Sequence, residues 1–115
     1  MYANQSVTVS PLSEATLRSI FSMRLTLWPD GSQIEVVVLA DKHGLHRQFS
    51  KSVLGLFPYQ LRQIWDTGVF SGTGTAPIQV SSEAEMITTL ATTPGAIGYL
   101  MPQPTMEGIY LVNRP

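Results

Sequence analysis

The 115-residue sequence is long enough for one domain that buries roughly two-thirds of its unfolded surface. Hydrophobic residues make up 43% and charged residues 13%, so we expect a sizeable core and a surface covered by neutral polar side chains or by a partner. A net charge of −1 argues against nucleic acid as a partner. The lack of cysteine excludes disulfides and cysteine metal sites, and no apolar run is long enough to span a bilayer.

The charges are unevenly distributed along the chain. Residues 1–62 carry six basic and four acidic side chains, whereas residues 63–115 carry one basic and four acidic side chains. This mild polarity suits one small anion. The Met1–Asn4 start fits two alternatives: an ordinary cytoplasmic start, or the remnant of a signal-peptide cleavage site at Tyr2-Ala3 with Met1 added for expression.

The first half of the chain predicts two strands and a helix. Val7–Val9 reads as a short strand, and Ser13 then caps a helix that should end near Met23. A brief extended piece, Leu25–Trp28, ends in a Pro-Asp-Gly turn. Ile34–Leu39 follows as an almost continuously apolar strand, which is typical of a strand covered on both faces of a parallel sheet.

The second half continues the alternation of helices and strands. A helix that buries Leu45, Phe49 and Val53 ends at Gly55, and another begins at Pro58 and closes at Gly68. After this helix the sequence predicts a loop over 71–77 and a strand at Ile78–Val80. The next helix is opened by a Ser82/Glu85 capping box and stopped at 93–95. The last predicted elements are a strand at Ala96–Leu100, in which Gly98 marks a close approach by another backbone, a loop over 101–108 and a strand at Ile109–Val112. This pattern predicts one α/β domain over 1–115, a small mixed sheet flanked by helices.

The stretch from Ile34 to Val53 is the centre of the functional hypothesis. A strand that feeds a helix N-terminus through a polar turn is where α/β proteins usually bind ligands. The Asp41–Arg47 turn is therefore the expected anion or solute site. Ser71 and Thr73 of the following loop and the helix start at Ser82 are expected to contribute to it. The candidate ligand-binding residues are Asp41, His43, Gly44, His46, Arg47, Ser71, Gly72, Thr73 and Ser82.

Catalytic and metal chemistry find little support in the sequence. No Gly-x-Ser-x-Gly elbow and no P-loop motif is present, and Glu35 and Asp66 have no partner carboxylate at a defined spacing. His43 and His46 with Asp41 could begin a metal site, but polar residues at a helix start account for them better. The 71–77 loop fits a flexible connector equally well. We therefore expect no enzyme activity, no metal and no cofactor, and we expect Trp28 and Trp65 in the core.

Several blocks of the sequence resemble the phosphate-type periplasmic substrate-binding proteins of ABC transporters, and in particular their short single-lobe relatives. The blocks cover nearly all of the chain after Val7 and comprise Leu12-Ser13 with Leu17-Arg18-x-Ile20-Phe21, Trp28-Pro29-Asp30-Gly31, Phe49 with Val53-Leu54-Gly55, Trp65 with Val69-Phe70-Ser71-Gly72-Thr73-Gly74, and Thr93-Pro94-Gly95-Ala96-Ile97-Gly98-Tyr99. The resemblance implies one lobe of a type II periplasmic-binding-protein fold, export to the periplasm with removal of a signal peptide, and capture of a small solute without catalysis.

The same resemblance points to an eroded ligand motif. The family's Arg-Asp-x-x-Ser-Gly-Thr turn falls on Ala40–His46, where Asp41 matches, Ala40 stands in the arginine position and Gly44-Leu45-His46 stands in place of Ser-Gly-Thr. Two functions follow as hypotheses. The first is capture of a small solute or oxyanion. The second is a protein-interaction or assembly module, including a homodimer, that uses exposed loop residues such as Leu56, Phe57 and Met101.

Overall fold

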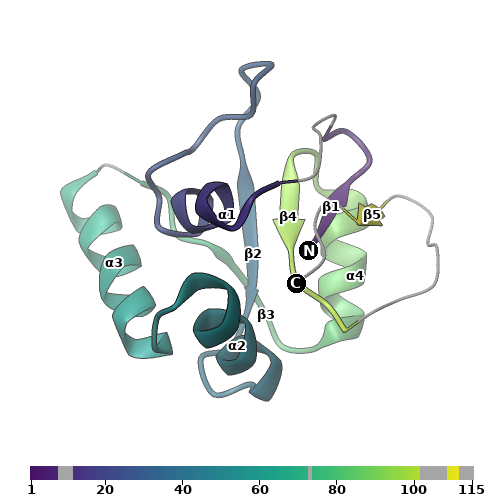
Figure 1. Cartoon of the computed structure of the whole chain (residues 1–115). Helices are drawn as coiled ribbons and strands as arrows, with labels where there is room; N and C mark the ends of the chain where they lie inside the picture. Colours follow the sequence, from purple (N-terminus) through teal and green to yellow (C-terminus); the bar gives the residue numbers. More distant parts are fainter. Residues whose placement is uncertain (8–11, 73, 102–108, 112–115) are drawn as a thin grey trace.

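Helices alternate with strands along most of the chain (Figure 1). The computed structural model describes residues 1–7, 12–72, 74–101 and 109–111. In chain order the elements are β1 (Tyr2–Asn4), α1 (Glu14–Phe21), β2 (Glu35–Leu39), α2 (Gly44–Phe49), the π-helical turn η1 (Ser50–Leu54), α3 (Pro58–Ser71), β3 (Ile78–Val80), α4 (Glu83–Thr92), β4 (Ala96–Gly98) and β5 (Ile109–Leu111). The predicted α/β class is confirmed.

The five strands form one mixed sheet in the order β3-β2-β4-β1-β5. Strands β3 and β4 run parallel to β2 on either side, whereas β1 is antiparallel to both β4 and β5. Val36 pairs with Ile97 on one side of β2, and Leu39 pairs with Val80 on the other. The consecutive residues Val37, Val38 and Leu39, whose side chains alternate between the two faces of β2, are all buried, so the strand is covered on both faces there, as predicted.

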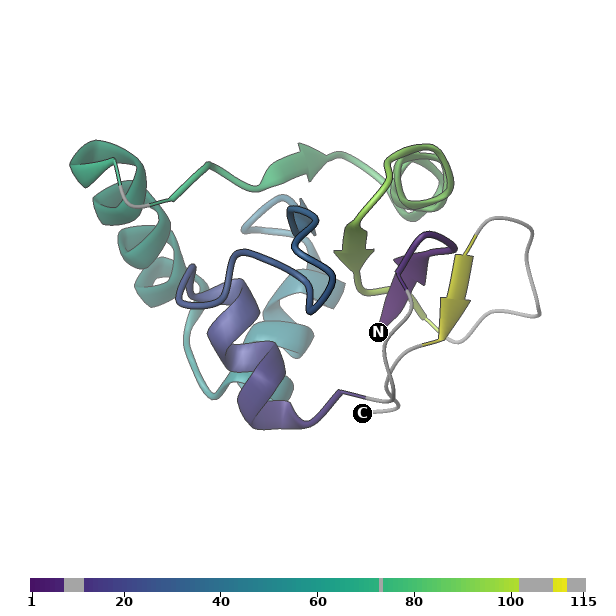
Figure 2. The same cartoon turned by 90° about the horizontal axis from the view of Figure 1, so that it is seen from above.

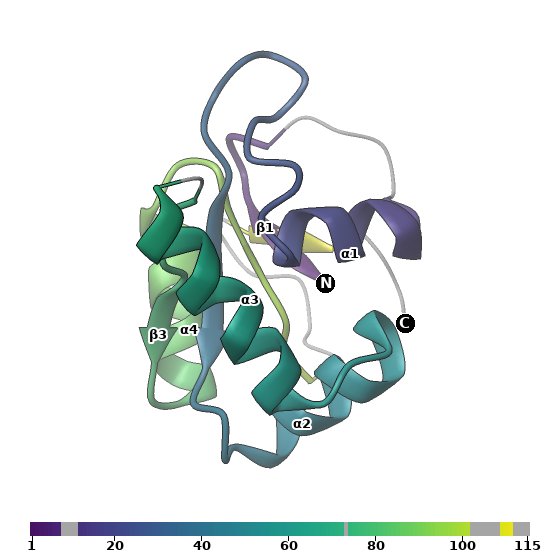
Figure 3. The same cartoon turned by 90° about the vertical axis from the view of Figure 1, so that its left-hand side faces the viewer.

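Helices cover both faces of this sheet. Figures 2 and 3 show α4 on one face and α1 with α2 on the other, while α3 lies beside β2. The connection from β2 to β3 runs through α2, η1 and α3, and the connection from β3 to β4 runs through α4. The carboxyl ends of β2 and β4 therefore form the topological switch point of the sheet, the place where open α/β sheets usually hold ligands.

The two tryptophans lie in the core, as predicted from the sequence, and each also joins two segments of the chain. Trp65 of α3 is buried, and its indole N–H donates a hydrogen bond of 2.7 Å to the carbonyl of Phe21 at the end of α1. Trp28 is also buried, and its indole N–H donates to the carbonyl of Gly95 at 3.0 Å. Each ring thus fills the core while its polar atom finds a partner.

Gly98 confirms the predicted close approach between backbones. A Cβ atom at this position would lie 3.1 Å from the carbonyl oxygen of Val37 and 2.7 Å from Sδ of Met86. The absence of a side chain lets β4 pack closely against β2 and against α4.

The predicted first strand, Val7–Val9, is wrong at Val7, and residues 8 and 9 lie outside the described part. Val7 is buried but follows a turn, and its N–H donates to the carbonyl of Asn4. The strand is β1, whose Tyr2 pairs with Gly98 on one side and Leu111 on the other. Pairing partners in the sheet, rather than the local valine pattern, decide which residues form the strand.

Other boundaries shift by a few residues. Helix α1 ends at Phe21 rather than near Met23, which adopts a left-handed φ of 66°. Helix α3 continues past the predicted end at Gly68, because Gly68 is buried within it and the left-handed terminating residue is Gly72. The predicted extended piece before the Pro-Asp-Gly turn is reduced to one bridge, between Leu27 and Gln33.

The end of the helix after β2 was predicted correctly, but its last turn is π-helical. Gly55 adopts a left-handed conformation and donates its N–H to the carbonyl of Ser50. The buried hydroxyl of Ser50 donates to the carbonyl of Leu56 at 2.7 Å.

At the carboxyl end of the sheet, β4 is shorter than predicted. Tyr99 and Leu100 lie beyond its end. The predicted final strand is present as β5, and Val112 lies outside the described residues.

Candidate functional site

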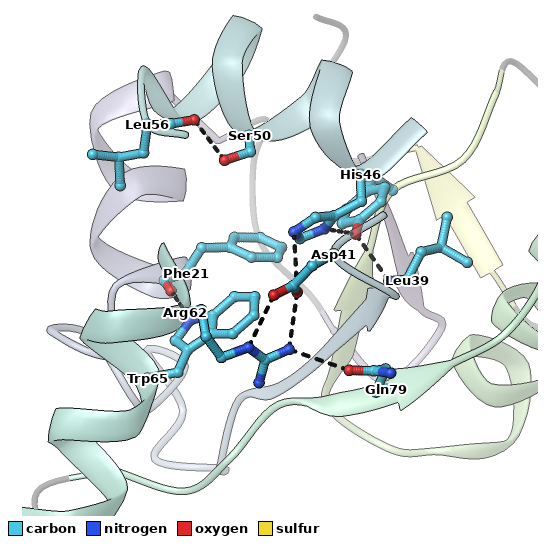
Figure 4. Close-up of polar contacts among 10 residues, drawn as sticks. Phe21, Leu39, Asp41, His46, Ser50, Leu56, Arg62, Trp65 and Gln79 are labelled. Atoms are coloured by element: carbon cyan, nitrogen blue, oxygen red, sulfur yellow. Dashed lines mark hydrogen bonds and ion pairs between the residues drawn. The ribbon is translucent and has the colours of Figure 1, made fainter. Parts of the chain in front are cut away.

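The turn after β2 is organised by an ion pair between Asp41 and Arg62 of α3 (Figure 4). Arg62 donates from Nε to Oδ2 at 3.1 Å and from Nη2 to Oδ1 at 2.9 Å, and Nη2 also donates to the side-chain oxygen of Gln79. The guanidinium also lies 5.1 Å from the ring centroid of Trp65. The carboxylate raises the pKa of Arg62. The bidentate geometry fixes α3 against the carboxyl ends of β2 and β3.

His46 and Tyr99 fill the switch point behind this ion pair. The hydroxyl of Tyr99 accepts the backbone N–H of Leu39 at 2.9 Å and is hydrogen-bonded to Nδ1 of His46. The Tyr99 ring stacks on Phe49, with centroids 4.2 Å apart. Burial raises the pKa of Tyr99, and the negative charge of Asp41 acts in the same direction. Tyr99 therefore remains a neutral hydroxyl that satisfies two buried groups.

The His46 ring lies between Tyr99 and Asp41. The Tyr99 hydroxyl can donate as well as accept, so it can pair with Nδ1 of His46 in either neutral tautomer of the ring, whose other nitrogen is Nε2. That Nε2 atom is buried without a hydrogen-bond partner, and Oδ1 of Asp41 lies 3.9 Å away. Burial lowers the pKa of His46, with Asp41 opposing the shift and Arg62 and His43 adding to it. His46 is a core residue in the neutral form.

The rest of the predicted turn lies at the surface around this cluster. His43 caps α2, and its Nδ1 accepts the N–H of Leu45 at 3.2 Å. Gly44 is the first residue of α2, and Arg47 is exposed in its last turn. Lys42 is exposed as well. Asp41, His43, Gly44, His46 and Arg47 are thus brought together, but only around a carboxylate that already has a cation.

Ser82 lies at the same edge of the sheet as Asp41. It follows β3 as Asp41 follows β2, each two residues beyond the paired Val80 and Leu39. Its hydroxyl caps α4 by accepting the N–H of Glu85 at 3.1 Å. The first turn of α4 carries Glu83 and Glu85, which already supply the negative charge that a helix N-terminus favours.

Ser71 and Gly72 lie at the opposite end of β2. Gly72 lines a hollow together with Glu35 and Val36, at the start of that strand, whereas Asp41 lies beyond its end. The hydroxyl of Ser71 donates to the carbonyl of Thr67 within α3. Thr73 lies outside the described residues. The structure therefore does not bring Ser71 and Gly72 to the Asp41–Arg47 turn.

A hollow of about 280 Å³ opens beside the switch point, between α1, α2, η1 and the chain that follows β4. Its walls are largely apolar, with Phe49, Tyr99 and Leu100 on the switch-point side. Its polar side chains are Glu14, Gln48 and Ser52. The full lining is Met1, Glu14, Leu17, Leu45, Gln48, Phe49, Ser52, Val53, Tyr99, Leu100 and Met101.

The sequence prediction missed the two residues that define the cluster, Arg62 and Tyr99. Arg62 carries the only basic side chain of α3 and precedes the inward-facing Trp65 by three positions, which places it on a neighbouring helix face. Tyr99 directly follows a buried strand, where side chains reach the carboxyl edge of a sheet. Both signals were present, but nothing in the local pattern joined them to Asp41.

The described residues hold neither a metal cluster nor a membrane-spanning helix. Within residues 1–7, 12–72, 74–101 and 109–111, no group of three or more His, Asp or Glu side chains is placed to hold a metal ion. In the same part of the chain, no helix has the length and apolar character needed to cross a bilayer.

The fold and its switch-point cluster define a binding-protein-like α/β domain, and the sequence comparison identifies which kind. The chain belongs to the family described as "PBP superfamily domain", whose model matches residues 3–104. The predicted type II periplasmic-binding-protein fold is therefore confirmed.

Among solved structures, the chain is similar to the PstS protein of Borrelia burgdorferi, with a TM-score of 0.64 and 18% sequence identity. The match covers 86% of this chain and 38% of that protein, so the chain spans less than half the length of its structural relative. At this identity the likeness concerns the fold alone. A comparison with curated proteins gives no match.

Proposed function

We propose that this chain is a non-catalytic binding domain that works in the periplasm and captures a small organic solute in the hollow beside the switch point. The observation that carries the proposal is the position of the hollow, at the carboxyl ends of β2 and β4 between α1 and α2. A volume of about 280 Å³ is close to the lower end of the range for small-molecule sites.

The lining selects the chemical class of the solute. Phe49, Tyr99 and Leu100 offer apolar surface, so the ligand needs an apolar body. Gln48 and Ser52 can exchange hydrogen bonds with a polar group, and the carboxylate of Glu14 favours a ligand that donates them. This chemistry suits a small neutral or cationic organic molecule better than phosphate.

An oxyanion at the Asp41–Arg47 turn is the less favoured ligand. Asp41 neutralises Arg62 there, and two glutamates occupy the first turn of α4. An incoming anion would have to compete with Asp41 for the guanidinium or rely on the exposed cations Lys42 and Arg47, whose attraction is weakened by solvent and salt.

Calorimetric titration tests the proposal with two sets of ligands: phosphate, sulfate and small carboxylates in one, and indole, small amines and apolar amino acids in the other. We expect binding only in the second set, and its loss in Ser52→Trp, which fills the hollow. Lys51→Trp is the matched control, because it adds the same side chain at the exposed neighbouring position outside the hollow. Binding of phosphate, or silence of the second set up to millimolar concentrations, refutes the assignment.

A second candidate, a protein-interaction module that includes homodimers, is favoured by exposed aromatic side chains. Phe70 at the end of α3 is 95% exposed, and Phe57, which stacks on Tyr59, is 50% exposed. Of the loop residues predicted to be exposed, Met101 is also 50% exposed, whereas Leu56 is half-buried against the core, so the prediction was wrong for Leu56. Sedimentation at several concentrations tests self-association, and Phe70→Ser should shift any dimer towards monomer.

A further inference from the structure

We infer that the groove between α1 and α3 is a docking site for an acidic, amphipathic peptide segment of a partner protein. The groove is separate from the solute hollow and from the exposed aromatic side chains. It consists of two adjoining hollows of about 630 and 410 Å³, which share Ser22, Arg24, Leu56 and Ile64 in their linings. Their shared wall makes them one continuous depression that is larger than the solute hollow, and this extent suits a chain segment better than a compact solute.

The floor of the groove is apolar and ready to take side chains from a partner. Leu54 and Leu61 are buried beneath it, whereas Leu56 and Ile64 are only half-buried and present part of their surface. Leucine or isoleucine side chains at helical spacing would cover these two residues and gain the free energy of removing apolar surface from water.

The rim of the groove carries positive charge, which favours an acidic partner. Arg18 and Arg24 line it, and neither forms an ion pair with another residue in the part of the chain that the structure describes. Neither hollow has an acidic residue in its lining, and the remaining polar positions carry hydroxyl or amide groups, such as Gln60 and Gln63. Two exposed guanidiniums over an apolar floor are complementary to carboxylates that flank apolar side chains.

The groove is held in shape before any partner arrives. The indole N–H of Trp65 donates to the carbonyl of Phe21 and joins α3 to the end of α1. The Asp41–Arg62 pair fixes α3 at a second point. A preformed groove spends less binding free energy on ordering itself, so a short segment can bind measurably.

The test uses a fluorescein-labelled peptide of about twelve residues with leucines along one helical face and glutamates beside them, and a matched peptide with glutamine in place of each glutamate. Fluorescence anisotropy should show binding of the glutamate peptide and weaker binding of the glutamine peptide. Raising the salt from about 0.1 M to about 1 M shortens the screening length from about 10 Å to about 3 Å and should weaken only the glutamate peptide.

Substitutions test whether the peptide binds at the groove. Arg18→Gln and Arg24→Gln should each weaken the glutamate peptide about two- to fivefold, which is typical of exposed ion pairs. Arg47→Gln is the matched control, because it removes the same charge from an exposed position on α2 that lines neither hollow, and it should leave the affinity unchanged. Ile64→Ala should weaken both peptides, because it removes apolar floor.

Backbone amide chemical shifts of the unmodified protein give a readout that does not depend on variants. On addition of the glutamate peptide, the largest changes should fall on Ser22, Ile64 and Thr67. Equal affinity for the two peptides, equal losses in Arg47→Gln and Arg24→Gln, shifts mapped elsewhere, or no binding up to millimolar concentrations would each overturn the inference. None of these results bears on Ser52→Trp, so the solute proposal is judged separately.

Discussion

The hydroxyl of Tyr99 is the hydrogen-bond partner of two buried polar groups, so Tyr99→Phe is the most informative stability test in this fold. The substitution removes the acceptor of the Leu39 N–H and the hydrogen-bond partner of His46 Nδ1. The phenyl ring keeps its stacking on Phe49, whose centroid lies 4.2 Å away. The change therefore isolates the hydrogen bonds from the packing.

The expected cost follows from the burial of the orphaned groups. Leu39 and His46 are both fully buried. A buried donor or acceptor left without a partner costs about 1–3 kcal/mol, so losing the Tyr99 hydroxyl, the partner of two such groups, should lower the free energy of unfolding by about 2–6 kcal/mol. This is a large share of the total stability of a small domain.

Urea titration followed by tryptophan fluorescence measures this loss, because Trp65 is buried close to the His46 ring. Tyr59→Phe is the matched control, since Tyr59 is exposed and the same hydroxyl is lost there; it should change the free energy of unfolding by less than about 0.5 kcal/mol. A loss below about 0.5 kcal/mol in Tyr99→Phe as well would refute the claim that this hydroxyl satisfies both groups.

Three further outcomes follow from the same geometry. Gly98→Ala should destabilise the protein by about 1–3 kcal/mol in urea titration, because the new methyl group would press on the carbonyl of Val37. Arg62→Gln should cost only about 0.5–1 kcal/mol, and less at high salt, because the side chains of Arg62 and Asp41 are each about one-third exposed. The depressed pKa of buried His46 means that the unfolded chain binds a proton first as the pH falls. The free energy of unfolding should therefore decrease below about pH 6.5, and this decrease should be less steep in His46→Gln.

Each of these outcomes has a control or a contradicting result. Gly44→Ala meets open space, so unlike Gly98→Ala it should cost little. Lys42→Gln removes an exposed cation for which no ion pair is found among the described residues, and a loss equal to that of Arg62→Gln would contradict the role of the Asp41 pair. A slope below pH 6.5 that is identical in the wild type and His46→Gln would show that other groups carry the acid sensitivity.

Much of the scaffold could be predicted because its signals are local. The apolar run of β2, the serine caps of α1 and α4, and the left-handed stop at Gly55 each depend on a few neighbouring residues. The buried glycine of β4 was also predicted, since a glycine inside an apolar strand commonly marks a close approach by another backbone. The first strand failed for the opposite reason: β1 is held by its partners on both sides, and a local valine pattern carries no information about such pairing.

The candidate site was predicted in part. The sequence placed Asp41, His43 and His46 at one turn, and it indicated that the groups expected to hold an oxyanion were missing. It could not show that Arg62, 21 residues away, neutralises Asp41, or that Tyr99, 53 residues beyond His46, fills the space behind it. Pairings over such separations depend on how helices and strands pack, which no local pattern encodes.

The sequence by itself determined the class of the fold and the strand-turn-helix unit from Ile34 to Val53, because periodicity, caps and glycines act over a few residues. The family was indicated separately, by the resemblance of its sequence blocks, and the family model confirms it. Only the tertiary structure decided which side chains surround that unit. Packing of α3 and β4 against β2 brings a cation to Asp41 and a hydroxyl to His46, and it leaves an apolar hollow beside them. Burial and charge pairing between distant segments thus leave no free cation at the expected anion site among the Asp41, His46 and Arg62 side chains, and they place this cluster beside an apolar hollow.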